Sequence, residues 1–307
     1  MEALDVVLKV LHKNFTNEIV VPVKPGPVGY GLLLKLRLLL YAMLMEIFST
    51  RKLVKHLRKR KHVLRRLGFE ALPDKRTLDR WKHKHDYELQ QAVTLVGNSY
   101  LQLSESEWSI LDSTPLVDEN DPEATVGHNS QGPFIGFKLH MSCDEKEVPL
   151  RAVVTQAHVH DSQKAKDIMA PTSLAGGDGS YDSQELRKYA KEQGTRLITV
   201  HNPRREGKAA KKPTPKKLKK VRFHIEQCNG FTKSEVMRHA WIFLKGLKAK
   251  ATFALTAVLA VQALALFNLT TWGYPSIRIQ ELEFLKIIYK WLISSTINLS
   301  NRGAIHL

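Results

Sequence analysis

The spacing of apolar residues changes near Trp108, and this change divides the chain into a helical first part and a part of strands and helices. Between Ile135 and Cys143, apolar Phe137, Leu139 and Met141 alternate with polar residues, which is the period of a β-strand. Strands of this kind, followed by strands and helices in turn, predict a mixed α/β layer. The strands are expected at residues 108–112, 135–143, 148–155, 174–178 and 196–200, and the helices of this layer at 161–169 and 183–193.

The first part predicts an all-helical, helix-turn-helix-like domain. An apolar helix is expected at 30–48, and a helix with nine Lys or Arg at 51–67, broken near Lys61. Gly68 ends it, and a short basic helix at 75–85 follows, with Leu78 and Trp81 buried. In such modules the last helix lies in the DNA major groove, although the same pattern suits a solvated basic face on an ordinary helical bundle. The expected DNA contacts are Arg76, Arg80, Lys82 and Lys84.

Charge and cysteine usage limit the partners and the compartment. The net charge of +17 indicates a polyanionic partner, nucleic acid first and an anionic membrane surface second. The two cysteines, Cys143 and Cys228, lack zinc-ligand spacing and cannot staple a chain of this length, which favours a reducing cytosol. The N-terminus carries Glu2 and Asp5 and lacks the layout of a signal peptide. We therefore expect a cytoplasmic, nucleoid-associated protein.

One uncharged stretch resembles a membrane span in length. Residues 251–269 contain no charge and approach the roughly 20 residues that cross a bilayer. The stretch is rich in Ala and Thr and contains Gln262 and Asn268. A buried helix packed against a sheet is the preferred interpretation, with a membrane span as the alternative.

Three acids stand out by their neighbours. Asp112 closes the run WSILD, and Asp178 closes SLAGGD, so both are expected at carboxyl ends of strands, where sites on such sheets lie. Glu226 follows Arg222 by four residues and precedes Lys233 by seven, which would place the three on one helical face. Taken alone, that face also suits a surface ion-pair ladder.

The residue types favour magnesium over zinc. Two divalent ions about 3.5–4 Å apart suit phosphodiester cleavage, and Mg²⁺ prefers carboxylate oxygens and retained waters. His158 and His160 would favour zinc, but they adjoin a helix start, so we expect them to be non-ligands, with Asp161 as a cap or packing residue. Residues 203–222, with ten Lys or Arg, are expected to form a solvated loop that leads a polyanion toward Glu226.

Several motifs together resemble the DDE transposases of bacterial and archaeal insertion sequences. They are LDSTPL around Asp112, the GFKLH strand, QAHVHDS, GDGSYDS around Asp178 and RFHIEQCNGFTK around Glu226. The likeness covers roughly residues 111–269 and, more loosely, the N-terminal basic helices. The branch with a Tyr-Arg-Glu-Lys third motif fits best, although Lys219 stands at the Tyr position. The second motif departs too, because the glycine of Asp-x-Gly-Tyr is shifted while Tyr181 is in place.

The resemblance implies a fold, a reaction and its residues. The fold would be RNase H-like, with a mixed sheet flanked by helices. The partners would be double-stranded DNA at the element ends and in the target, bound by a homodimer, and no membrane would be involved. Two Mg²⁺ ions, for which Mn²⁺ substitutes, would be held by Asp112, Asp178 and Glu226, while Arg222, Lys233 and Lys219 contact phosphates. The ends would be nicked and the freed 3′-hydroxyl would attack target DNA. The domains would be 1–103 for DNA binding, 104–271 for catalysis with a basic loop at 203–220, and a 272–307 tail.

Two other classes of protein share these features. One is a sequence-specific DNA-binding protein whose catalysis has decayed, for which the Lys219 and glycine departures are the hints. The other is a structure-specific nuclease without strand transfer. An assay that joins a pre-nicked end to target DNA separates the three.

Overall fold

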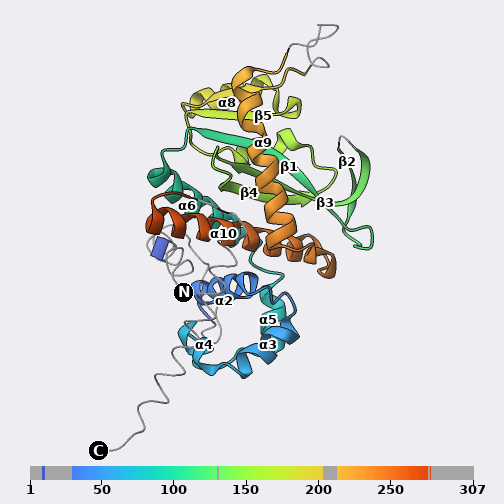
Figure 1. Cartoon of the computed structure of the whole chain (residues 1–307). Coiled ribbons are helices and arrows are strands. Elements are labelled where there is room, and N and C mark those ends of the chain that lie inside the picture. The colour runs from blue at the N-terminus through green and yellow to red at the C-terminus, as the bar shows by residue number, and fades with distance from the viewer. Residues whose placement is uncertain (1–8, 11–29, 130, 203–212, 276, 278–307) are drawn as a thin grey trace, which may run out of the picture.

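The computed structural model describes residues 9–10, 30–129, 131–202, 213–275 and 277 of the chain. The predicted N-terminal arm, most of the basic loop and the predicted tail helix at 279–292 lie outside these residues. Figure 1 shows a sheet with helices packed around it and a group of smaller helices at one end of the molecule.

A six-stranded mixed sheet forms the centre of the fold, as the period-two pattern predicts. From one side, β4 pairs with β3, β3 with β1, β1 with β5 and β5 with β6, and β2 also pairs with β3. The pairs among β1 to β4 are antiparallel, while β1–β5 and β5–β6 are parallel. The strands are β1 (Trp108–Val117), β2 (Thr125–Asn129), β3 (Gly132–Cys143), β4 (Pro149–Gln156), β5 (Leu174–Gly177) and β6 (Arg196–Thr199).

The polar residues 113–133, rich in Gly, Pro, Asn and Asp, predict a loop, and this prediction is wrong for much of their length. β1 continues to Val117, and β2 occupies part of the remainder. Residues Ile110 to Val117 pair with β3, and this pairing keeps β1 extended although its polar Ser and Thr side chains do not predict a strand. Gly136 of β3 allows the strands to approach closely, because a Cβ there would lie 2.3 Å from the carbonyl oxygen of Leu116.

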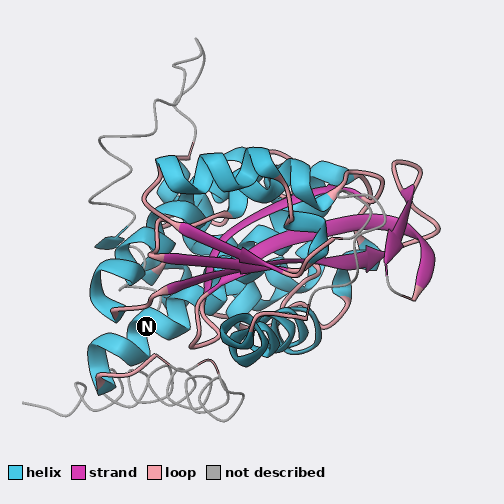
Figure 2. Cartoon of the chain, turned by 90° about the horizontal axis from the view of Figure 1, so that it is seen from above, coloured by secondary structure: helices cyan, strands magenta, loops and turns pink. Residues whose placement is uncertain are grey.

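Helices cover both faces of the sheet (Figure 2). On one face a small core joins Leu111, Ala175 and Leu197 of the strands to α7 (Asp161–Ile168) and α8 (Gln184–Glu192). On the other face α6 and α10 pack on β4, and α9 packs on β1, β3 and β5. The bounds of these three helices are α6 (Asp86–Ser104), α9 (Lys216–Phe231) and α10 (Leu247–Trp272).

The uncharged stretch forms α10, which is a core helix. α10 is long and apolar enough to span a bilayer, but 89% of its most apolar window is buried inside the protein. Gln262 lies inside this core, and its amide donates to the carbonyl oxygens of Val93 and Pro149 at 2.9 and 3.0 Å. These contacts meet the hydrogen-bonding need of a buried amide, as the preferred interpretation of a helix packed against a sheet requires.

Short basic helices form the N-terminal part. Ser49 caps α3 by accepting from the Lys52 amide, and Asp74 caps α5 by accepting from the Arg76 amide. Leu78 and Trp81 are buried as predicted. α6 packs against α10 and β4, so it is more than the connecting helix that the sequence of residues 87–103 predicts. The remaining helices are α2 (Leu32–Leu44), α3 (Thr50–Arg58), α4 (Lys61–Arg66) and α5 (Lys75–Trp81).

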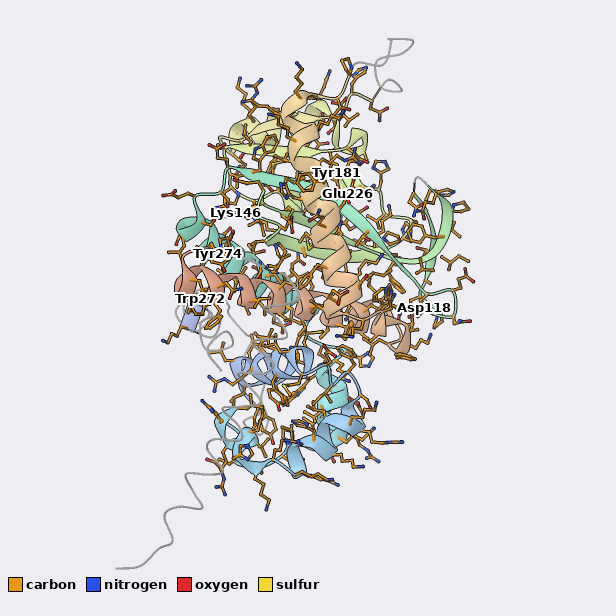
Figure 3. All side chains as sticks on the ribbon, in the orientation of Figure 1. Asp118, Lys146, Tyr181, Glu226, Trp272 and Tyr274 are labelled. Atoms are coloured by element: carbon orange, nitrogen blue, oxygen red, sulfur yellow. The ribbon has the colours of Figure 1, made fainter. Side chains whose placement is uncertain are left out.

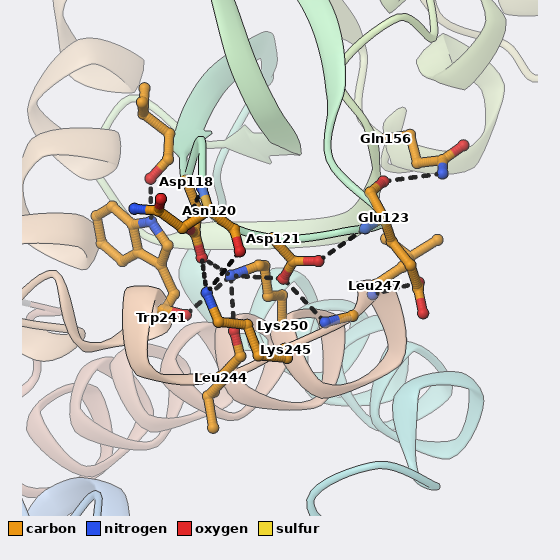
Figure 4. Close-up of polar contacts among 12 residues, drawn as sticks. Asp118, Asn120, Asp121, Glu123, Gln156, Trp241, Leu244, Lys245, Leu247 and Lys250 are labelled. Carbon is orange, nitrogen blue, oxygen red and sulfur yellow. Dashed lines mark hydrogen bonds and ion pairs between the residues drawn. The ribbon is translucent and has the colours of Figure 1, made fainter.

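A buried ion cluster ties the connection after β1 to the start of α10 (Figure 4). The Lys250 ammonium, fully buried, lies 2.7 Å from Asp118 Oδ2 and 3.2 Å from Asp121 Oδ2. It also donates to the carbonyl oxygens of Trp241 and Leu244 at 3.0 and 2.9 Å. This cluster fixes the far end of the strand that carries Asp112.

Candidate active site

Asp112 and Asp178 lie on neighbouring parallel strands. β1 pairs with β5 in a register that places Ile110 opposite Gly176. Asp112 lies two residues after Ile110 on β1, and Asp178 lies two residues after Gly176, one residue past the end of β5. The two carboxyls are close enough for the charge of Asp178 to raise the pKa of Asp112. Asp178 follows the last residue of β5 as predicted, but Asp112 lies within β1 rather than at its end, because β1 extends to Val117.

The nearby Asp178 contributes to a raised pKa of Asp112. Burial and, to a smaller extent, the negative charge of Asp178 raise the pKa of the Asp112 carboxyl to about 7, against the hydrogen bond from the Ser113 amide and the positive charge of Arg222. Two carboxylates that repel in a desolvated position favour a proton or a cation between them.

A tight turn after β5 holds Asp178. The Asp178 carboxylate caps the 3-10 turn Gly179–Tyr181 by accepting from the Ser180 amide at 2.9 Å. The Tyr181 ring packs so closely on Gly177 that a Cβ there would lie 2.6 Å from it. The Tyr181 hydroxyl is buried without a hydrogen-bond partner, and burial and the charges of Asp161, Asp112 and Asp178 raise its pKa.

α9 crosses the sheet over β1 and brings side chains to it. The Asn229 amide donates to Asp112 Oδ2 at 3.0 Å, and the Lys233 ammonium donates to Thr114 Oγ1 at 3.1 Å. Lys233 lies in a π-helical turn, Thr232–Val236, and burial lowers the pKa of its ammonium. Helix α9 therefore contacts the strand of Asp112 at two points.

Glu226 lies on α9 one turn before Asn229 and is exposed (Figure 3). Within the described part of the chain, no three His, Cys, Asp or Glu side chains are grouped closely enough to hold a metal ion. The fold thus brings Asp112 and Asp178 together and leaves Glu226 apart from them. The predicted helix for Glu226 is present and begins at Lys216, so residues 216–220 are helical and not part of a loop.

The pair of aspartates still suits a divalent cation. Burial and the charge of Asp178 raise the pKa of the Asp112 carboxyl, and among the described residues Asn229 Oδ1 and the Tyr181 hydroxyl are buried without hydrogen-bond partners. Oxygen donors of this kind are the ones that Mg²⁺ prefers. Asn229 was not predicted from the sequence, although its position three residues after Glu226 places it on the same helical face.

The polar residues around α7 have other contacts. Asp161 accepts from the Lys138 ammonium at 3.0 Å, and it does not cap α7. The cap is His160, whose Nδ1 accepts from the Ser162 amide. His158 Nδ1 lies 3.1 Å from Thr125 Oγ1.

The predicted DNA contacts differ in exposure. Arg76, Arg80 and Lys84 are exposed. Lys82 is not presented with them, because its ammonium donates to the Phe48 carbonyl at 2.7 Å and burial lowers its pKa. Lys219 is exposed on α9, one turn before Arg222.

Comparison with known proteins places the chain among transposases. A family model described as a transposase DDE domain matches residues 104–262, just over half of the chain, and a transposase domain of the DUF772 type matches residues 3–84. No curated protein matches the chain. A solved piggyBac transposase synaptic complex with hairpin DNA is 11% identical, with a TM-score of 0.45, over 99% of this chain and 80% of that one. This chain belongs to the transposase DDE domain family and is a DDE-type transposase.

Proposed function

We propose that the protein cleaves DNA at the ends of a bacterial or archaeal insertion sequence and joins the freed 3′-hydroxyl to target DNA. The observation that carries this proposal is the placement of Asp112 on β1 beside Asp178 at the end of β5, where burial and the charge of Asp178 raise the pKa of Asp112. The spacing of Arg222, Glu226 and Lys233 supports the branch with the Tyr-Arg-Glu-Lys third motif.

Asp112, Asp178 and Glu226 are proposed as the catalytic carboxylates. They would hold two Mg²⁺ ions, or Mn²⁺ in their place, which supply charge neutralisation at the scissile phosphate and activation of water. Asn229 holds the Asp112 carboxylate from α9, and Ser180 holds that of Asp178. Glu226 lies exposed on the same helix, three residues before Asn229, and would supply the third carboxylate.

Three basic side chains are proposed to hold phosphates beside the scissile bond. Arg222 faces the site closely enough for its charge to lower the pKa of Asp112. Lys233 is anchored at Thr114, two residues after Asp112 on β1. Lys219, exposed one turn before Arg222, would contact the backbone further along the DNA.

The N-terminal helices are proposed to recognise the element ends as a helix-turn-helix-like unit. Arg76, Arg80 and Lys84 present charge on and after α5, while Lys82 supports the fold through Phe48. The expected DNA-binding unit of residues 1–103 includes α6, but α6 packs with α10 and β4, so we place the end of the unit near residue 85. The catalytic unit would be RNase H-like, because β4–β3–β1–β5–β6 combines antiparallel and parallel pairs in one sheet.

The protein is proposed to act as a homodimer on double-stranded DNA, associated with the nucleoid in the cytoplasm. The net charge of +17 supports binding to a polyanion.

An assay that joins a pre-nicked element end to target DNA tests the proposal. A duplex with the terminal inverted repeat that borders the reading frame, pre-nicked at its 3′ end, is incubated with a supercoiled plasmid, Mg²⁺ and the protein. Joined product is expected, and Asp178→Ala should abolish it. Cleavage of an intact end without joining would indicate a nuclease, and end binding without either reaction would indicate a DNA-binding protein with decayed catalysis.

A further inference from the structure

A basic groove lies at the edge of the sheet opposite β4. It has a volume of about 1020 Å³ and runs between α8, β6 and the start of α9. Four cationic side chains line it: Arg187, Arg196, Lys216 and Lys217. None of the functional residues assigned above lies in this groove.

The groove has a clear excess of unpaired positive charge. Among its described lining residues one is acidic, Asp182, which accepts from the Arg187 guanidinium at 2.6 Å and lies 3.8 Å from His201 Nδ1. Arg196, Lys216 and Lys217 are exposed and form no ion pair with any described residue. Within the part of the chain that the structure describes, a ligand in the groove therefore meets three cations that no carboxylate offsets.

A protein strand is a poorer occupant than a polyanion. β6 is the last strand of the sheet and pairs only with β5. The Arg187 guanidinium lies over its outer side, with Nη1 3.5 Å from the Leu197 carbonyl and Nη2 2.8 Å from Thr199 Oγ1. A charged side chain on an edge strand opposes strand addition, and a second copy of the chain would bring the same cations against these.

The groove is connected directly to the aspartate pair. Asn202 bonds to the Asp182 carboxylate through its backbone amide at 2.9 Å and to the Gly179 carbonyl through its side chain at 3.1 Å. Gly179 belongs to the turn that Asp178 caps. The wall of the groove and the position of Asp178 are therefore parts of one hydrogen-bonded turn.

The groove also lies on the far side of the site from the N-terminal helices. In Figure 1, α8 and the start of α9 are at one end of the molecule, α3 to α5 are at the other, and β1 lies between them. Lys216 precedes Asn229, the α9 residue that bonds to Asp112, by 13 residues of helix, which is about 20 Å or about six base-pair steps of 3.4 Å.

We propose that this groove binds the phosphate backbone of the DNA that flanks the element end, about six base pairs outside the scissile phosphate. The inference rests on the proposed function, because it takes the aspartate pair as the position of the scissile phosphate. DNA held by the N-terminal helices and crossing the site continues toward α8, and the groove offers cations to its backbone there.

The test compares two duplexes that carry the same terminal inverted repeat from the border of the reading frame. One ends at the element terminus, and the other continues for about ten base pairs of flank, roughly one turn of helix. Binding by the full chain is measured without divalent ions across a series of salt concentrations. Each phosphate that a Lys or Arg neutralises steepens the dependence of log K on log salt by about 0.9.

The variant Lys216→Ala/Lys217→Ala removes two cations without removing a buried contact. The wild type should show a steeper salt dependence on the flanked duplex, and the variant should lose about two units of slope there and none on the unflanked one. Arg196→Ala should lose about one unit. The matched control is Lys188→Ala/Lys191→Ala, which removes two exposed lysines of α8 that do not line the groove.

Two results would overturn the proposal. They are an equal loss of slope on both duplexes and an unchanged slope on both. The assay requires no cleavage, so its failure is distinct from failure of the proposed function, which the joining assay measures.

Discussion

Asp112 is the residue whose environment departs most from that of an ordinary carboxylate. Burial and the neighbouring Asp178 raise its pKa to about 7, whereas an unfolded chain has an Asp pKa of about 3.9. Between these two values the folded protein holds a proton that the unfolded chain loses. The metal-free protein is therefore expected to lose stability as the pH rises from about 4 to about 7.

The Asp112→Asn variant should lack this loss, because an amide does not titrate. Melting temperatures in a chelator between pH 5 and pH 8 measure the difference. Asp167→Asn, a change of an exposed carboxylate on α7, serves as the control and should follow the wild type. Parallel curves for Asp112→Asn and wild type would contradict the assigned environment.

Lys219 is the second residue at which chemistry can be tested, because it stands where the family pattern has Tyr. A lysine offers a mobile point charge, whereas a tyrosine offers a hydroxyl and a ring for stacking. Lys219→Ala should weaken DNA binding strongly at low salt and little at high salt, and Lys219→Tyr should retain activity with less dependence on salt. Unchanged cleavage by Lys219→Ala at every salt concentration would remove Lys219 from the site.

At the scale of elements, the Lys250 cluster fixes the end of β1 against α10. Lys250→Met would leave Asp118 and Asp121 buried without the ammonium between them. Breaking a buried ion pair in this way costs about 3–5 kcal/mol. Urea denaturation should show a loss of this size, while Lys248→Met, an exposed lysine of the same helix, should lose well under 1 kcal/mol. Similar losses for both variants would show that the cluster does not stabilise the fold.

The sequence predicts the strands that alternate and misses those that do not. β3 has a clear period-two pattern from Phe137 to Met141, whereas Ser113 and Pro115 of β1 belong to the sheet because β3 pairs with them. The start of α9 reads as a charged run, since Lys216–Lys220 holds only one apolar residue, Leu218, which is buried in the core. Local pattern cannot reveal partners of this kind.

The site was predicted in part for the same reason. Asp112 and Asp178 are marked by the apolar runs before them, so their neighbouring positions follow from strand order. The bond from Asn229 to Asp112 joins residues 117 positions apart, and the bond from Lys250 to Asp118 joins residues 132 apart. Such contacts depend on how α9 and α10 pack, which the spacing of residues along one helix does not determine.

In the molecule as a whole, the basic N-terminal helices and the aspartate pair belong to parts of the chain that pack against each other. α2 packs against α10, so the N-terminal unit shares its core with the catalytic unit. Tests of recognition are therefore best made on the full chain.

Arg76→Ala and Arg80→Ala should reduce discrimination between the element end and random DNA. A side chain that reads a base edge contributes about 1–3 kcal/mol of discrimination, or roughly a fivefold to 150-fold loss in the affinity ratio. Competition binding at fixed salt measures this ratio, with Lys188→Ala of α8 as the control. Equal losses on both DNAs would show that the two arginines contact phosphates only.

Asp112, Asp178 and Glu226 are the three carboxylates of the proposed catalytic site. The most direct measurement is Mg²⁺-dependent nicking at the element end by the three single Ala variants, alongside binding of the same DNA without Mg²⁺. Glu192→Ala, an exposed acid on α8, is the control and should cut normally. If these three carboxylates are catalytic, each of the three variants binds the end and fails to nick it. Nicking by Glu226→Ala at the wild-type rate would contradict this assignment, because the third carboxylate would then lie elsewhere.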